Sequence, residues 1–113
     1  MTFKELDAFK KDVKGLSKKY RSLEEDLMVV RKILRLMPDE RPPFSTTVEE
    51  HVDSNIIKVR KIACKSLKGH GGNSGLQLLY AYFEKEEKIV LIGLYHADDK
   101  PSVEKKMMLR KLQ

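Results

Sequence analysis

Apolar residues recur every three or four positions along the first third of the chain. The first such series predicts an amphipathic helix from Asp7 to about Lys19, because this spacing places apolar side chains on one face and lysines on the other. Asp7 is a residue type that caps helix N-termini well. The apolar members of the series are Phe9, Val13, Leu16 and Tyr20.

A second series predicts a helix that Pro38 ends, and Ser22 with Glu25 has the spacing of a capping box at its start. Because the connection is short, the two helices should form an antiparallel hairpin that covers a sheet. Residues 2–6 fit either an extension of the first helix or a short edge strand. The apolar members of the second series are Leu23, Leu27, Val30, Ile33, Leu34 and Met37.

The period changes to that of β-strands after a loop at residues 39–45, which contains Pro42 and Pro43. Residues 56–64 predict a strand with Lys58 and Arg60 on one side and apolar residues on the other. Residues 76–83 and 88–95 are apolar on both sides, which predicts central strands that are covered on both faces or left partly open for a partner. Residues 47–52 fit a helical turn or an extended piece.

A short final helix is predicted from about Pro101, a residue well suited to the first turn of a helix. The order of elements predicts an α+β protein, with a helical hairpin packed on an antiparallel sheet of three to four strands and the helices gathered at one side. At 113 residues the chain is expected to form a single domain spanning residues 1–113.

Charge is distributed unevenly. The formal net charge is +6, and residues 57–75 carry five basic and no acidic side chains, whereas residues 38–56 carry one basic and five acidic ones. This segregation favours a polyanionic or acidic partner over a purely solubilising role. No apolar run is long enough to cross a membrane, and the start of the chain lacks a secretory signal. Together with a lone Cys64, expected to be a buried structural thiol, these features predict a cytoplasmic protein.

Motifs for cofactors are lacking in the sequence. The four glycines between residues 69 and 75 join two predicted strands without a Walker pattern, so they fit a turn, or a loop that approaches a nucleic-acid backbone with Lys65, Lys68 and His70. The three histidines lack the spacing of a zinc site, so neither a metal nor a cofactor is predicted. His96, at the end of a predicted strand, is the histidine to consider for acid–base chemistry.

Three stretches, in their order and spacing, resemble the RelE/ParE toxin superfamily of bacterial toxin–antitoxin systems. They are FKKDVKGLSKKYRSLEEDL, IIKVRKIACKSLKGHGGNSGLQLLYAYF and KIVLIGLYHADDK, and the likeness covers nearly the whole chain. The resemblance implies a small α+β fold and a cognate acidic antitoxin. It also implies one of two activities, which are cleavage of mRNA on the ribosome or inhibition of DNA gyrase, and an inactive relative that only binds a partner is the third alternative.

The resemblance further implies a site on the concave face of the sheet. Arg60 matches the strand arginine of the RNA-cutting branch, while Tyr95 and His96 stand near its acid–base region. Gln77 stands where that branch usually has arginine and Ala97 where lysine is common, which weakens the expected stabilisation of phosphate. The catalytic candidates expected to meet near one pocket are Arg60, Gln77, Tyr95 and His96. The expected nucleic-acid contacts are Lys58, Lys61, Lys65, Lys68 and Lys100.

Overall fold

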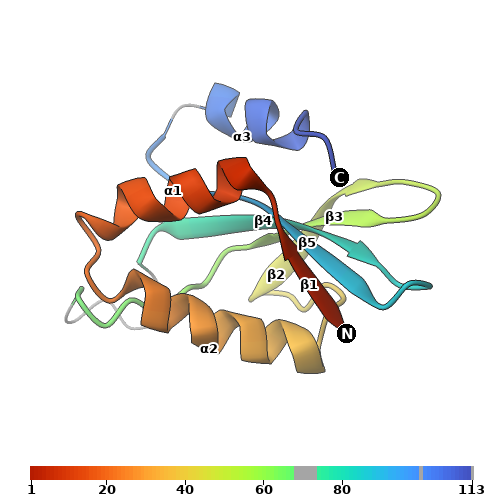
Figure 1. Ribbon diagram of the computed structural model, residues 1–113, viewed down its shortest axis with the longest axis horizontal. Coiled ribbons are helices and arrows are strands. Elements are labelled where there is room, and N and C mark those ends of the chain that lie inside the picture. The colour runs from red at the N-terminus through yellow and green to blue at the C-terminus, as the bar shows by residue number, and fades with distance from the viewer. Residues whose placement is uncertain (68–73, 100, 113) are drawn as a thin grey trace.

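One five-stranded sheet organises the protein, in a computed structural model that describes residues 1–67, 74–99 and 101–112 (Figure 1). The strand order is β1-β5-β4-β3-β2, in which β1 is parallel to β5 and the other neighbours are antiparallel. The strands are β1 (Thr2–Glu5), β2 (Ser45–Glu50), β3 (Asn55–Val59), β4 (Leu76–Phe83) and β5 (Lys88–His96). The helices are α1 (Asp7–Ser17), α2 (Leu23–Leu36) and α3 (Pro101–Met108).

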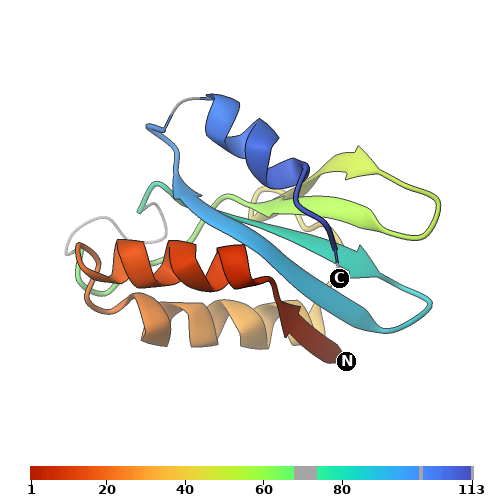
Figure 2. The ribbon, with the colours of Figure 1, turned by 45° about the horizontal axis from the view of Figure 1, so that its top comes forward.

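The helices surround the sheet from three sides. α2 lies under one face, α1 runs along the edge of β5 beyond the end of β1, and α3 lies across the opposite face (Figures 1 and 2). At the β5 edge, the Leu94 amide has no neighbouring strand and instead donates a hydrogen bond to the Asp12 carboxylate of α1, at 3.2 Å. The Asp12 side chain thereby satisfies a backbone group that would otherwise lie unpaired at a sheet edge.

The central strands β4 and β5 form the middle of the core. Every residue of β5 from Ile89 to Tyr95 is buried, and most of β4 is buried as well. α2 covers one side with Leu23, Leu27, Val30 and Leu34, and α3 contributes Met107 on the other. These strands are therefore covered on both faces, so they are not left open for a partner.

In the described part of the chain, no helix is both long enough and apolar enough to cross a membrane.

The α+β class is confirmed, but the predicted sheet is wrong in two respects. It has five strands rather than three to four, and it is mixed because β1 runs parallel to β5 with Phe3 opposite Ile89. For residues 47–52, the extended alternative is the correct one over most of the segment, since β2 covers Ser45–Glu50. The helices do not gather at one side, because α3 crosses to the face opposite α2 (Figure 2). Four-residue strands carry too little periodicity to be recognised in a sequence.

The predicted cap at Asp7 is wrong, whereas Ser22 occupies the predicted cap position of α2 without making the predicted bond. Asp7 is the first residue of α1, with Leu6 in the cap position, so its carboxylate lies in the first helical turn. Ser22 precedes α2 but makes no capping bond to the backbone. Its hydroxyl instead donates to Asp26, with 2.7 Å between the oxygens, and accepts the Ser66 amide hydrogen at 2.8 Å. Ser22 thus connects α2 to the segment after β3.

The strand predicted over residues 56–64 ends early. β3 stops at Val59, and the Arg60 amide donates to the Phe44 carbonyl at 2.8 Å rather than continuing a regular ladder. The segment from residue 60 to 67 is then held against α2 by buried Asp26, which accepts the Lys65 amide hydrogen at 3.3 Å. Cys64 is buried in this segment, 3.2 Å from the Ser66 hydroxyl. The predicted burial of Cys64 is confirmed, although the residue lies after β3 and not within a strand.

Candidate functional site

The sheet register decides which of the predicted site residues can meet. Gln77 of β4 lies opposite Tyr95 of β5, and Lys58 of β3 lies opposite Leu79. Directly opposed residues in antiparallel strands point to the same face, and side chains alternate along each strand. Lys58, Gln77 and Tyr95 therefore share the face that α3 crosses. This face carries the candidate site.

A basic hollow of ≈ 480 Å³ opens on this face at the end of β3. Arg60 and Lys61 supply two exposed cations, and Gln77 supplies an amide. None of the described residues that line the hollow is acidic. The described residues that line it are Pro42, Pro43, Ser45, Thr46, Arg60, Lys61 and Gln77.

The loop at residues 39–45, called the proline loop below, forms one wall of the hollow. Hydrogen bonds between Arg41 and Ser45 close this loop. The Arg41 amide donates to both the hydroxyl and the carbonyl of Ser45, at 2.8 and 3.2 Å, and the Ser45 amide donates to the Arg41 carbonyl at 3.0 Å. The bond between the Arg60 amide and the Phe44 carbonyl then joins this loop to the end of β3. The two cations consequently stand beside a fixed backbone wall.

Lys58 lies deeper on the same face, beneath α3. Its Nζ atom is 3.4 Å from both carboxylate oxygens of Glu104, and the two side chains are only 16% and 25% exposed. Tyr95 is buried nearby, and its hydroxyl has no hydrogen-bond partner among the described residues. Burial, followed by the neighbouring Glu104 carboxylate, raises the pKa of Tyr95, while the Arg60 charge opposes the shift. Tyr95 therefore stays protonated at neutral pH.

His96 belongs to the other face of the sheet. It lies opposite Leu76, one position beyond Tyr95, so its side chain points to the side that α2 covers. The His96 ring stacks on Tyr20 and lies against Gly75, where an added Cβ would come within 2.4 Å of Nε2. Its Nδ1 atom accepts the Asp98 amide hydrogen at 3.0 Å. The structure brings Arg60 and Gln77 together, with Tyr95 near them, but it does not bring His96 to the hollow.

The remaining lysines of the predicted site are dispersed. Lys65 is exposed and lies 3.6 Å from Glu25 of α2, away from the residues that line the hollow. Lys68 and Lys100 lie outside the described residues. Within the described ranges, no three His, Cys, Asp or Glu side chains gather closely enough to hold a metal ion. The chemistry available at the hollow is that of fixed cations and amide donors.

Such a set of groups suits a phosphodiester. Arginine presents a planar fork of N–H donors that matches two phosphate oxygens, lysine adds a point charge, and a glutamine amide adds a neutral hydrogen bond. Backbone phosphates of a single strand can follow such a groove, with affinity dominated by the cations.

The fold has a counterpart among solved structures, although no family model and no curated protein matches the sequence. A chain from the crystal structure of the archaeal RelE–RelB complex of Pyrococcus horikoshii OT3 is similar, with a TM-score of 0.63 and 17% sequence identity. The match covers 88% of this chain and 97% of that one. The protein therefore has a RelE-like fold, as the resemblance in sequence implies.

Sequence reasoning missed Glu104 as a member of this face. It stands three positions after Pro101, where an acidic residue reads as a favourable charge in the first turn of a helix. Nothing in that local pattern places it over β3. The proline loop was recognised as a loop, but its contact with Arg60 joins residues 16 positions apart and leaves no local signal.

Proposed function

We propose that this protein is the toxin of a type II toxin–antitoxin system and that it cuts mRNA on the ribosome. The observation that carries the proposal is the basic hollow, in which Arg60, Lys61 and Gln77 stand together on the face of a RelE-like sheet that α3 crosses. Its described lining holds two cations and no carboxylate, which suits an RNA backbone. The proposed site of action is the cytoplasm, where mRNA and ribosomes are found.

The proposed roles follow from the chemistry of each side chain. Arg60 binds the scissile phosphate and stabilises the charge that develops on it when the adjacent 2′-hydroxyl attacks. Lys61 and Lys58 hold neighbouring phosphates, and Gln77 donates a neutral hydrogen bond in place of the arginine that the RNA-cutting relatives usually have. Tyr95 is a candidate proton donor to the leaving oxygen, since its hydroxyl is protonated at neutral pH. His96 acts as a structural residue in this scheme.

An acidic antitoxin is the proposed protein partner. The solved neighbour is RelE in complex with RelB, and the net charge of +6 on the present chain favours an acidic partner. Large apolar side chains are exposed on α2, where Met28 is 58%, Val29 49% and Leu36 80% exposed. This surface, rather than the covered sheet, is the apolar area that a partner segment would bury.

Expression in bacteria tests the activity. If the proposal is right, growth stops, protein synthesis falls first, and ribosome-bound transcripts carry discrete cuts. A gyrase inhibitor, the alternative favoured by the loss of arginine at Gln77, would instead raise the DNA-damage response and leave transcripts intact. Normal growth with neither effect would identify a relative that acts only by binding a protein.

Co-purification tests the partner. Co-expression with the product of a short, acidic neighbouring reading frame should yield a tight complex and restore growth. A chain that stays monomeric, with no neighbouring product binding it, would contradict the toxin–antitoxin assignment.

A further inference from the structure

The position of Glu104 is unusual for an acidic side chain. It comes from α3, yet its carboxylate lies against the Lys58 ammonium, on the sheet face that also carries the basic hollow. Both of its carboxylate oxygens are 3.4 Å from the Lys58 ammonium, and both side chains are largely shielded from water. An ion pair in such a setting is weakened less by salt than an exposed pair. Glu104 therefore neutralises the charge of Lys58.

The Tyr95 hydroxyl adds a second observation at the same place. It is a buried donor without a hydrogen-bond partner among the described residues, in a side chain that is only 5% exposed. The charged side chains that act on this hydroxyl are Glu104 and Arg60. Buried hydroxyls are ordinarily satisfied, and an exception calls for an explanation such as an absent ligand. A cation and an unsatisfied donor at one place are what an anion requires.

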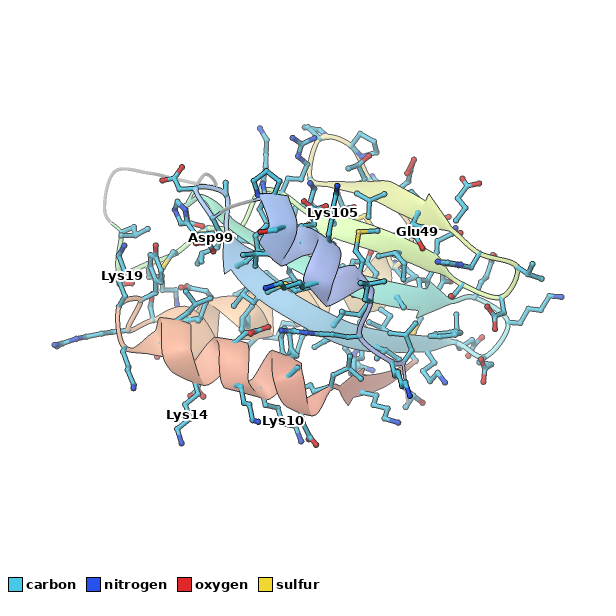
Figure 3. The ribbon with its side chains drawn as sticks, turned by 90° about the horizontal axis from the view of Figure 1, so that it is seen from above. Lys10, Lys14, Lys19, Glu49, Asp99 and Lys105 are labelled. Atoms are coloured by element: carbon cyan, nitrogen blue, oxygen red, sulfur yellow. The ribbon has the colours of Figure 1, made fainter. Side chains whose placement is uncertain are left out.

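α3 is held to the sheet by buried Met107, and Val103 and Met108 pack against the same core. Met107 rests on Gly93, where an added Cβ would come within 2.6 Å of the Met107 sulfur. Beyond the helix, Arg110 donates to Asp12 and to the Ile92 carbonyl, both at 2.8 Å. Lys105 of α3 (Figure 3) is exposed, and Leu109 is 83% exposed. Undocking of the helix would uncover the face of β4 and β5 that Met107 covers, whereas the face packed by α2 would stay closed.

We propose that Lys58 and the Tyr95 hydroxyl form a phosphate-binding site, and that the Glu104 carboxylate blocks it by pairing with Lys58 whenever α3 is docked, which leaves the Tyr95 hydroxyl without an acceptor among the described residues. Carboxylate and phosphate oxygens accept the same hydrogen bonds, so only one of them can bind at a time. A carboxylate tethered on α3 competes at a high effective concentration. Binding of RNA along the whole face then requires α3 to move aside. This inference rests on the proposed function in that it takes the ligand to be an RNA phosphate.

Binding of a short single-stranded RNA to the full chain tests the proposal. Glu104→Gln keeps the shape of the side chain but removes the competing charge. Glu84→Gln is the matched control, because Glu84 is an exposed acid at the opposite end of β4 from Gln77 and its loss changes the net charge equally. Glu104→Gln should bind RNA about tenfold more tightly than the control, the effect of one charge-assisted hydrogen bond. Its salt dependence should steepen by about 0.7 in log–log slope.

The double variant locates the effect. Adding Lys58→Gln to Glu104→Gln should abolish the gain if the released cation is Lys58, whereas a general loosening of α3 would leave the gain in place and overturn the proposal. Equal affinities for Glu104→Gln and Glu84→Gln would overturn it too. Circular dichroism of each variant establishes that all of them are folded.

Inorganic phosphate separates the fate of this inference from that of the proposed function. If Glu104→Gln binds phosphate through Lys58 but no variant binds RNA, the anion site stands and the proposed RNA ligand is wrong. If Glu104→Gln binds neither RNA nor phosphate more tightly than Glu84→Gln, the anion site is wrong. Cleavage of ribosome-bound transcripts by the wild-type protein would still support the proposed function in that case.

Discussion

The imidazole of His96 stacks on the ring of Tyr20, with centroids 6.4 Å apart and planes 8° from parallel. The stack joins the end of β5 to the connection between α1 and α2. It also fixes His96 on the face opposite Gln77 and Tyr95, so the histidine that looked suited to acid–base chemistry is a packing residue of the helical side.

Replacing His96 should affect stability more than cleavage. His96→Ala removes the stack and the acceptor of the Asp98 amide hydrogen, and it should lower the free energy of unfolding by about 1–2 kcal/mol. Cleavage per folded molecule should stay within about threefold of wild type, roughly the effect of a 0.5 kcal/mol surface change. Urea unfolding and a ribosome cleavage assay measure the two quantities. A folded His96→Ala protein with cleavage reduced a hundredfold would return His96 to the site.

Two buried tyrosines offer a contrast in hydrogen bonding. The Tyr80 hydroxyl donates to the Pro38 carbonyl at 2.6 Å, whereas the Tyr95 hydroxyl has no partner among the described residues. Tyr80→Phe should therefore cost about 1 kcal/mol of unfolding free energy, and Tyr95→Phe should cost nothing or stabilise the protein slightly. Urea titration at neutral pH compares the two. Equal losses would mean that the Tyr95 hydroxyl has a partner in solution.

The same tyrosines predict an alkaline limit to stability. Burial raises the pKa of Tyr80 and of Tyr95 above the usual value of about 10, because the charged phenolate is poorly solvated in the core. A pKa raised in the folded state gives stability that is complete below the unfolded pKa and is lost as pH rises above it. Unfolding free energy should hence fall above about pH 10. Replacing both tyrosines with phenylalanine should flatten that fall, and an unchanged slope would contradict this origin.

The elements with strong periodicity were predictable from sequence, and those fixed by tertiary contacts were not. β4 matches its predicted bounds because apolar residues on both faces require a central strand. β1 stayed ambiguous because Phe3 gains its strand partner only when β5, 86 residues away, lies beside it. Ser22 fitted a capping box, yet its hydroxyl bonds to Asp26 because the 60–67 segment supplies the polar groups that surround it.

The same distinction holds for the site. Arg60 and Gln77 were expected to be neighbours because the family resemblance placed them on adjacent strands, and the structure brings both to the hollow. The separation of Tyr95 from His96 follows from strand alternation, which was readable, but which face carries the hollow depends on the proline loop and on α3. Glu104 enters the site through a helix that crosses the sheet, and no local pattern encodes that crossing.

A substitution at Gly93 can displace α3 from the sheet without changing the net charge of the protein. Gly93→Ala places a Cβ 2.6 Å from the Met107 sulfur and 3.0 Å from an Arg110 nitrogen, so the helix has to shift. The substitution should cost about 1–3 kcal/mol, as overpacking does, and should speed hydrogen exchange over residues 101–108.

Gly15→Ala is the matched control for this change. Gly15 lies inside α1, where an added Cβ meets nothing within 4 Å, so alanine should stabilise the helix by about 0.5–1 kcal/mol. Exchange over residues 101–108 should stay at the wild-type rate. If Gly93→Ala leaves that rate unchanged as well, α3 is not held at Gly93 in solution.

Arg60 and Gln77 provide the most direct mutational test of the proposed chemistry. Arg60→Ala removes a charge-assisted contact to the phosphate, and it should lower the rate of cleavage on programmed ribosomes by about 30-fold, equivalent to about 2 kcal/mol of transition-state stabilisation. Gln77→Arg should raise the rate, because it adds a permanent charge and a forked donor to a hollow of ≈ 480 Å³ that already binds anions in this scheme.

Lys65→Ala is the control for both variants. Lys65 carries the same charge as Arg60 but pairs with Glu25 outside the hollow, so its loss should change cleavage by less than about threefold at constant salt. A surface that only docks a protein partner predicts a different pattern. In that case Arg60→Ala would lower the affinity for the partner in a salt-dependent way, and Gln77→Arg would have no effect on transcripts. Unchanged cleavage by Arg60→Ala would exclude the hollow as the site of reaction.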